Sequence, residues 1–184
     1  MHKIETNRLL ILALDLECLV LLQKDRTLLE KHLNLRFSGH QISGEAKVEV
    51  LEAMKFWMQG VREHPDTYEW YTAWEIILKD KNQSIGGIGF TGLPDENGST
   101  LVGYHIDERF RNEGFASEAL QAMIAWAIKN RKLKQLIADT PLENIASQRV
   151  LIKNGFVQES VSNNMTTWVL PIQKQSAIGK VFEN

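Results

Sequence analysis

The sequence predicts a single domain of mixed α/β class, distinct from a parallel Rossmann sheet. The order of expected elements is a strand, helices, three antiparallel strands, a βαβα segment and a closing hairpin. One central strand carries apolar residues on both alternating faces, as strands covered on two sides do. No repeat, low-complexity segment or Pro/Gly-rich linker interrupts the 184 residues, so one domain over residues 1–184 is expected.

The N-terminal third is expected to begin with a strand and continue in helices. Ile4–Leu14 is rich in leucine and isoleucine and is predicted to form the first strand. Asp15–Lys24 follows as a helix with Asp15 as its N-cap. Asp25–Gly44 lacks a strong pattern and is expected to hold short helical pieces at most. Apolar residues at helical spacing predict a helix over Glu45–Val61 that ends before Pro65.

The middle of the chain has the pattern of an antiparallel meander. Trp70–Lys79 is the strand with two apolar faces. Ser84–Leu93 follows a polar turn and contains three glycines, which weaken a strand but allow another backbone to approach closely. Leu101–Ile106 follows a second turn at Asn97-Gly98.

The C-terminal third is predicted to alternate strands and helices before a hairpin. An amphipathic helix follows Ala116, with Leu120, Met123 and Ile124 on one face. Residues 172–184 are polar and are expected to form a C-terminal tail. The other expected elements are a strand over Leu133–Asp139, a helix over Ile145–Asn154, and hairpin strands over Phe156–Val161 and Met165–Leu170.

Charge and cysteine content exclude several classes of protein. Twenty-one basic and twenty-three acidic residues give a net charge of −2, which argues against nucleic acid as the main partner. Cys18 is the single cysteine, so an internal disulfide and a multi-cysteine zinc site are excluded and a cytoplasmic protein without metal is expected. No apolar run approaches the roughly 18–20 residues of a membrane span, and the opening residues lack a signal-peptide core.

The segment before the amphipathic helix has the features of an anion-binding loop. Arg111, Gly114 and Ala116 fit the pattern Arg/Gln-x-x-Gly-x-Gly/Ala. The first turn of a helix leaves backbone N–H groups unpaired and carries roughly half a positive charge, which suits a pyrophosphate. Arg109 and Arg111 could add positive charge at the mouth. Any loop with a glycine at positive φ ahead of a helix would also fit, and neither a Walker loop nor a dinucleotide fingerprint is present.

A second motif makes the sequence similar to a known family. The residues Asn144, Ser147, Leu151, Lys153, Gly155 and Phe156 follow the pattern Asn-x-x-Ser-x-x-x-Leu-x-Lys-x-Gly-Phe. Together with the loop, Glu5–Leu9 and Gly103–Leu120, this makes about residues 4–171 resemble the GNAT superfamily of acyl-CoA-dependent N-acyltransferases. The resemblance is strongest to its RimJ/RimL-like branch of ribosomal-protein N-terminal acetyltransferases.

The resemblance implies a fold, a cosubstrate and a reaction. The fold is a mostly antiparallel sheet with one splayed parallel strand pair and helices on both faces. The pantetheine arm of acetyl-CoA would lie in the gap, opposite Ala138–Thr140, while an amine of a protein N-terminus or a small molecule attacks the thioester directly. The residues implied to hold acetyl-CoA are Tyr104, His105, Ile106, Arg111, Asn112, Glu113, Gly114, Phe115, Ala116, Ser117, Asn144 and Ser147.

The acid and base of this reaction are indicated less strongly. Many enzymes of the family place a tyrosine where this chain has Leu151, so Ser147 or a water molecule would protonate the departing thiolate. Glu75, in an apolar strand, and His105, near the loop, are the candidate bases. Structural roles are open for each: an N-cap for Asn144, a helix-surface hydroxyl for Ser147, and hydrogen-bonded or surface groups for the two bases.

The acceptor is expected to bind between Asp15–Val61 and the closing hairpin, with Asp25–Gly44 setting specificity. The aromatic residues that could line this site, although such residues are more often core, are Trp57, Trp70, Tyr71 and Trp168. Leu151 is compatible with an alternative, a catalytically weak CoA-binding module for sensing or interaction. A homodimer is compatible with the family, but the sequence identifies neither an interface nor the amine.

Overall fold

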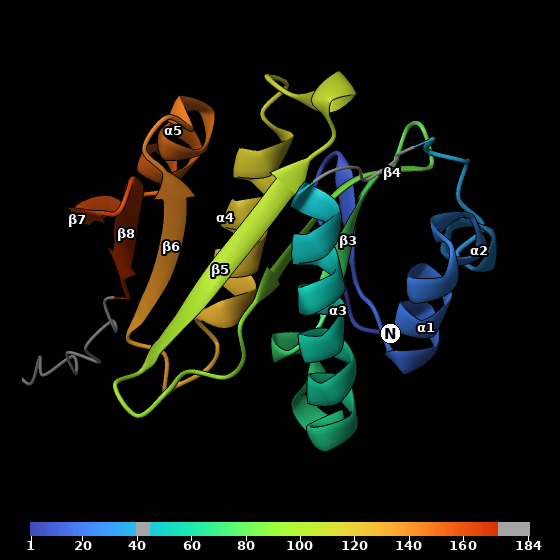
Figure 1. Ribbon diagram of the computed structural model, residues 1–184, viewed down its shortest axis with the longest axis horizontal. Coiled ribbons are helices and arrows are strands. Elements are labelled where there is room, and N and C mark those ends of the chain that lie inside the picture. The colour runs from blue at the N-terminus through green and yellow to red at the C-terminus, as the bar shows by residue number, and fades with distance from the viewer. Residues whose placement is uncertain (40–44, 173–184) are drawn as a thin grey trace, which may run out of the picture.

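The computed structural model describes residues 1–39 and 45–172, with residues 45–51 described by their backbone alone. Within these residues eight strands form one sheet in the order β1-β2-β3-β4-β5-β6-β8-β7 (Figure 1). Strands β5 and β6 run parallel and the other neighbouring pairs are antiparallel. The expected mixed sheet is confirmed.

The elements follow the predicted order closely. The strands are β1 (Lys3–Glu5), β2 (Leu9–Ala13), β3 (Ala73–Leu78), β4 (Gln83–Phe90), β5 (Ser99–Ile106), β6 (Gln135–Pro141), β7 (Val157–Ser162) and β8 (Met165–Pro171). The helices are α1 (Leu16–Lys24), α2 (Arg26–His32), α3 (Glu45–Glu63), α4 (Phe115–Ala127) and α5 (Ile145–Lys153), with 3-10 turns η1 (Pro65–Trp70) and η2 (Glu108–Phe110).

The first predicted strand is in fact two strands. Strands β1 and β2 pair antiparallel, and the chain reverses between them at Thr6–Arg8. The backbone N–H of Thr6 donates to the carbonyl of Leu9 (2.9 Å), and the N–H of Leu9 donates to Thr6 Oγ1 (2.8 Å). A threonine side chain therefore closes this turn, and no glycine or proline marks it in the sequence.

Two aspartates organise the first helices. Asp15 accepts a hydrogen bond from Cys18 N and caps α1, as predicted. Asp25 accepts from Thr27 N (2.7 Å) and caps α2, the short helical piece expected in Asp25–Gly44. Residues 40–44 of that segment and 173–184 of the expected tail lie outside the described residues. No helix in the described ranges is both long and apolar enough to cross a membrane.

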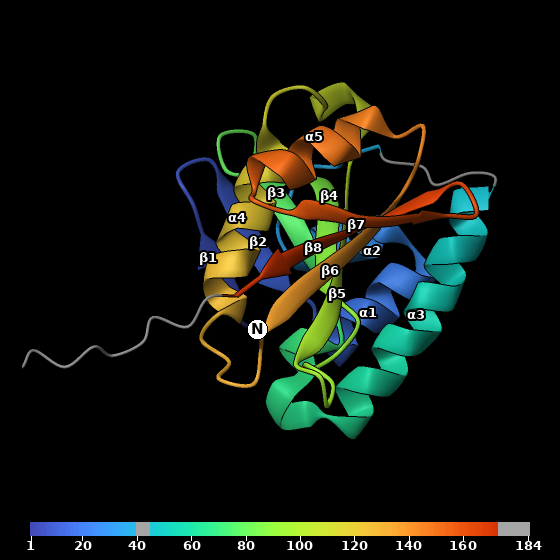
Figure 2. The ribbon, with the colours of Figure 1, turned by 90° about the vertical axis from the view of Figure 1, so that its left-hand side faces the viewer.

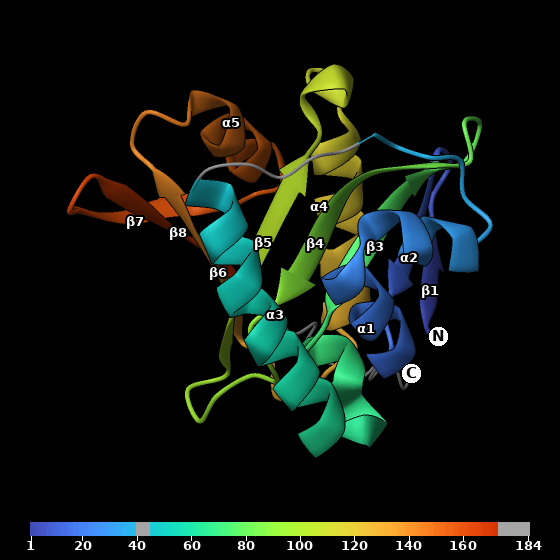
Figure 3. The same cartoon turned by 45° about the vertical axis from the view of Figure 1, so that its right-hand side comes forward.

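Helices cover both faces of the sheet. Figure 1 shows α3 in front of the sheet and α4 behind it, and Figure 3 shows α1 and α2 on the same side as α3. The larger apolar cluster packs α4 and Leu151 of α5 against one face, with Trp74 and Ile76 of β3 at its centre. The smaller cluster joins α1, α2 and α3 through Leu19, Leu29 and Met54. Apart from Ala73, the residues of β3 are buried, which confirms that both of its faces are covered.

The parallel pair separates along its length. Strand β5 pairs with β6 only from Ser99↔Gln135 to Leu101↔Ile137. Beyond these positions β5 continues to Ile106 and β6 to Pro141 without pairing to each other, and the two arrowheads diverge (Figures 1 and 2). The splayed pair implied by the family resemblance is therefore present.

The glycines of β4 yield a prediction about stability. A Cβ built at Gly86 would overlap the carbonyl oxygen of His105, whereas one built at Gly103 would meet nothing within 4 Å. We expect Gly86→Ala to lower the free energy of unfolding by about 2 kcal/mol, because β4 and β5 would be forced apart. The matched control Gly103→Ala should stay within about 0.5 kcal/mol of the wild type in urea denaturation. Equal stability of the two variants would contradict the close approach of these strands.

Candidate active site

The opening between β5 and β6 is the first element of the site. Val102–Ile106 has no partner in β6, so the backbone edge of β5 faces the gap. A buried backbone polar group without a partner costs on the order of 1–3 kcal/mol, so such an edge either stays hydrated or pairs with a ligand. An extended ligand that carries amide groups, as a pantetheine arm does, can bond to this edge as an added strand would.

Tyr104 of β5 spans the gap toward α5. Its hydroxyl lies 3.1 Å from Ser147 Oγ and 3.3 Å from the Ser147 carbonyl oxygen. Burial raises the pKa of Tyr104 more than the Ser147 hydrogen bond lowers it, so the phenol is protonated at neutral pH. Asn144 accepts from Ser147 N (3.1 Å) and caps α5, which confirms its structural role. The structure thus brings Tyr104, Asn144 and Ser147 together.

The loop after β5 exposes the N-terminus of α4. Gly114 has a φ of +82°, a conformation that strains other residues, and the helix begins at Phe115. No side chain among the described residues caps α4, and the hydrogen bond from Glu118 N to Gly114 O (3.1 Å) closes the first helical turn. The N–H groups of Phe115, Ala116 and Ser117 precede that turn and are oriented to bind an anion.

Several loop side chains serve packing rather than an open site. Phe115 is buried in the core, so only its backbone is placed to contact a ligand. Ser117 is also buried, and its hydroxyl accepts from Asn154 Nδ2 (3.0 Å), which ties the start of α4 to the end of α5. Asn112 has a φ of +65°, so the backbone turns at two points before the helix. Among the predicted loop residues, the side chains of Phe115 and Ser117 therefore fix the position of α4.

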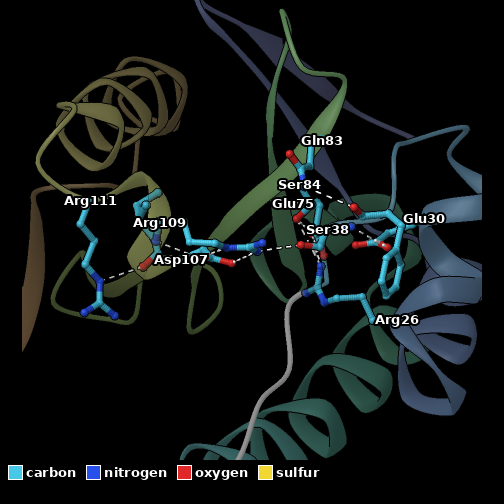
Figure 4. Close-up of polar contacts among 11 residues, drawn as sticks. Arg26, Glu30, Ser38, Glu75, Gln83, Ser84, Asp107, Arg109 and Arg111 are labelled. Atoms are coloured by element: carbon cyan, nitrogen blue, oxygen red, sulfur yellow. Dashed lines mark hydrogen bonds and ion pairs between the residues drawn. The ribbon is translucent and has the colours of Figure 1, made fainter.

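The two arginines at the mouth of the loop have different environments (Figure 4). Arg111 Nε donates to the Ile106 carbonyl (3.1 Å), and the side chain is 58% exposed. Arg109 instead forms two hydrogen bonds to Asp107, at 3.0 and 2.6 Å, and donates to the Ser38 carbonyl at 2.7 Å. Arg109 is therefore directed away from Arg111 and is paired with Asp107, whereas Arg111 stays beside the loop.

Glu75 is held in a buried cluster. Arg26 Nη1 lies 2.5 Å from Glu75 Oε1, and the Ser84 hydroxyl donates to the same oxygen (Figure 4). Burial lowers the pKa of Arg26. Its interactions with nearby carboxylates, above all Glu75, together raise this pKa by a larger amount, so the pKa of Arg26 is raised overall. The cluster joins α2 to β3 and β4, and it favours the hydrogen-bonded structural role of Glu75 over that of a free base.

His105 is the more accessible of the two candidate bases. Gly87 pairs with Glu75 on one side and His105 on the other, so the three residues lie in one row across the sheet. A Cβ built at Gly87 would lie 2.9 Å from His105 Cε1, which shows that the imidazole packs over this glycine. The side chain of His105 is exposed, whereas that of Glu75 is buried.

The four aromatic residues expected near the acceptor site have different environments. Trp70 packs in the core with its ring tilted against those of Phe90 and Trp126, and Trp168 of β8 is buried in the same apolar cluster. Tyr71 stacks on His64 with 4.1 Å between ring centroids, and Trp57 is partly buried. The four aromatic residues are thus divided between core and partly exposed positions.

Neither a thiol nor a metal cluster contributes to the geometry described. Burial and the neighbouring Asp15 carboxylate raise the pKa of the Cys18 thiol to about 12, so it is protonated and unreactive at neutral pH. Within residues 1–39 and 45–172, no three His, Cys, Asp or Glu side chains gather in a metal-binding group.

The sequence patterns did not predict two long-range side-chain contacts. The phenol of Tyr104 reaches Ser147, 43 residues later, and the side chain of Arg8 contacts the loop and α4 more than 100 residues away. Neither residue belongs to a local motif that specifies its partner, because the contact exists only once β1, β2 and β5 are placed in the sheet.

Sequence comparisons relate this chain to N-acetyltransferases. The acetyltransferase (GNAT) domain profile matches residues 8–157. The uncharacterized N-acetyltransferase YjdG of Bacillus subtilis is 29% identical over 167 residues, covering 90% of this chain and 96% of that protein. The ribosomal-protein-serine acetyltransferase of Escherichia coli K12 is 30% identical over 89 residues, covering 48% of this chain and 49% of that protein.

A solved structure has the same fold. RimL, a ribosomal L7/L12 α-N-protein acetyltransferase in complex with coenzyme A, aligns with a TM-score of 0.64 at 18% identity, over 93% of this chain and 98% of that one. The likeness in fold and the profile match therefore agree, and each extends over most of the chain. The protein belongs to the GNAT acetyltransferase family and is an acyl-CoA-dependent N-acetyltransferase.

Proposed function

We propose that this enzyme transfers the acetyl group of acetyl-CoA to the α-amino group of a protein or peptide N-terminus. The observation that carries the proposal is the separation of β5 and β6, with Tyr104 and Ser147 meeting across it. The E. coli relative is a ribosomal-protein-serine acetyltransferase, which supports a protein acceptor. Such an enzyme works in the cytoplasm, where acetyl-CoA and newly made proteins meet.

Acetyl-CoA binding is proposed to use two parts of the site. The pantetheine arm bonds to the backbone edge of β5 that faces the gap over Tyr104–Ile106, and Asn144 caps α5, whose Ser147 meets Tyr104 across the gap. The pyrophosphate accepts hydrogen bonds from backbone N–H groups between Arg111 and Ser117, where the helix dipole favours negative charge. Arg111 adds a partly exposed positive charge beside this loop. No metal is required for either contact.

The reaction is proposed to proceed by direct attack. The neutral amine attacks the thioester carbon, and backbone N–H groups of the β5 edge stabilise the negative charge on the carbonyl oxygen. The C–S bond then breaks as the carbonyl re-forms, and the thiolate takes a proton from water or through the Ser147 hydroxyl, which regains one from the hydrogen-bonded Tyr104 hydroxyl or from water. The proton lost by the amine passes to His105, which is exposed on the face it shares with Gly87, or to water. Glu75 contributes by holding the sheet and α2 together.

The environment of the candidate bases favours an acceptor amine of low pKa. Glu75 is occupied by Arg26 and Ser84, and the remaining candidate is an exposed histidine. An α-amino group with a pKa of about 8 is roughly one-tenth neutral at pH 7, whereas a lysine amine is neutral roughly once in 2,500 molecules. An enzyme with a weak base therefore gains much more from an α-amine than from a lysine side chain.

A panel of peptides tests the function. We expect acetyl-CoA-dependent release of free thiol with peptides that have a free N-terminus. Matched peptides with a blocked N-terminus, in which one internal lysine is the only free amine, should release at least tenfold less thiol. Small amines of low pKa form a third group. Thiol release only with the lysine peptides or only with small amines would contradict an N-terminal acceptor. Acetyl-CoA binding without release across the panel would favour the non-catalytic CoA-binding module.

The loop assignment predicts a selective loss of binding. Gly114→Glu adds a negative charge beside the N–H groups of α4 and strains a backbone with φ of +82°, so the affinity for acetyl-CoA should fall at least tenfold. Gly114→Asn is the matched control, because asparagine tolerates positive φ and brings no charge. Titration calorimetry measures both variants. Equal affinity of Gly114→Glu and wild type would mean that this loop does not hold the pyrophosphate.

The role of Ser147 predicts a loss of turnover rather than of affinity. Ser147→Ala removes the proposed acid and should lower kcat about tenfold to a hundredfold, with less effect on the KM for acetyl-CoA. Tyr104→Phe keeps the ring in the gap but removes the hydroxyl bonded to Ser147, so its effect should be smaller and should not add to that of Ser147→Ala. Unchanged kcat in Ser147→Ala would return this residue to a structural role.

A further inference from the structure

Arg8 connects the turn between β1 and β2 to the loop that precedes α4. Its Nη1 donates to the Glu113 carbonyl at 3.0 Å, and its Nε and Nη2 each lie 2.7 Å from Glu118 Oε2. The guanidinium also stacks over the ring of Phe115, 4.3 Å from its centroid. One side chain therefore contacts the residues before, at and after the start of α4, where the pyrophosphate is proposed to bind.

Glu118 places a negative charge in the first turn of α4. Its Oε1 accepts from Thr6 Oγ1 (2.5 Å) and from the backbone N–H of Arg8 (3.1 Å), and its side chain is 19% exposed. Burial raises the pKa of Glu118, but the hydrogen bonds from Thr6 and Arg8 lower it more. The carboxylate is therefore ionised at neutral pH, and it stabilises the positive end of the helix dipole.

The same charge conflicts with anion binding. A carboxylate in the first turn lies close to the N–H groups of Phe115, Ala116 and Ser117, and it would repel a pyrophosphate bound there. Arg8 pairs with that carboxylate through two nitrogens and lies 3.6 Å from the position of a Cβ built at Gly114. The positive charge of Arg8 thus cancels the charge of Glu118 at the edge of the loop.

We propose that Arg8 is a positioning residue for acetyl-CoA, which neutralises Glu118 and fixes the Glu113–Phe115 backbone so that the start of α4 can bind the pyrophosphate. The inference rests on the proposed function of this loop. In this inference, Glu118 attaches α4 to the β1–β2 turn, and Arg8 cancels the negative charge of Glu118 that would otherwise weaken anion binding. If the ion pair were purely structural, Glu118→Gln would weaken acetyl-CoA binding instead of leaving it unchanged or strengthening it.

The charges of the pair give a test by calorimetric titration with acetyl-CoA. Arg8→Gln leaves the Glu118 charge uncompensated and should weaken binding about tenfold. The double variant Arg8→Gln/Glu118→Gln removes both charges and should regain most of that affinity. Glu118→Gln alone should bind as tightly as the wild type or more tightly, because the loop then has one negative charge fewer. Arg8→Lys keeps the charge but loses the paired hydrogen bonds and the stacking on Phe115, so its affinity should fall between those of Arg8→Gln and the wild type.

Controls separate this effect from unfolding and from general charge effects. Lys3→Gln removes a positive charge from the neighbouring strand, where Lys3 pairs with the exposed Glu5 at 3.1 Å. Its affinity should match that of the wild type. Thermal unfolding of each variant shows whether it is folded, and kinetics should show a higher KM for acetyl-CoA in Arg8→Gln with little change in kcat. If Arg8→Gln does not fold, the affinity of Glu118→Gln for acetyl-CoA still tests the inference.

Three outcomes would overturn the inference. They are equal affinity of folded Arg8→Gln and wild type, a double variant no better than Arg8→Gln, and a weakened Glu118→Gln. Failure of the wild type to bind acetyl-CoA would instead contradict the proposed function of the loop. The two failures are therefore distinguishable in a single set of titrations.

Discussion

The separation of β5 from β6 is the constraint on which the site depends. Two parallel strands that pair over Ser99–Leu101 and then part have facing edges that are not paired to each other in the middle of a sheet. The neighbouring strands hold β5 and β6 apart, because β5 pairs with β4 over Val102–Ile106 and β6 pairs with β8 over Gln135–Pro141. The hydroxyl of Tyr104 meets Ser147 across this gap, and no side chain among the described residues caps the start of α4. We propose that the cosubstrate bonds to the strand edge that faces the gap and to the start of this helix.

Arginine–carboxylate pairs hold the surroundings of this gap. Arg26 with Glu75, Arg109 with Asp107 and Arg8 with Glu118 each have an N···O distance of 2.7 Å or less. Two of these pairs join elements that lie far apart in the sequence, and in each pair a buried or partly buried carboxylate is neutralised locally. Arg111 lies 3.6 Å from the exposed Glu108, and exposed pairs of this kind contribute about 0–1 kcal/mol. Of these four arginines, Arg111 is the one whose charge is least committed to the fold.

The same arrangement bears on the chemistry. The Glu75 carboxylate is held by Arg26 and Ser84, so we propose that deprotonation depends mainly on the substrate amine itself. An amine that is already neutral in an appreciable fraction of molecules then reacts fastest. On this proposal, a structural ion pair between α2 and β3 limits the class of acceptor, although it lies outside the strand gap.

The sequence by itself determined the features that depend on neighbouring residues. Alternation and helical spacing located nearly every strand and helix, Asp15 and Asn144 identified their caps, and Gly114 marked the turn before α4. Tertiary structure decided the contacts that join distant segments: Arg26 to Glu75, 49 residues apart, Tyr104 to Ser147, and Arg8 to Glu118, 110 residues apart. Periodicity and capping arise from hydrogen bonds within a few residues, so they are visible in the sequence. Which arginine meets which carboxylate depends on strand order and register, which no local pattern encodes.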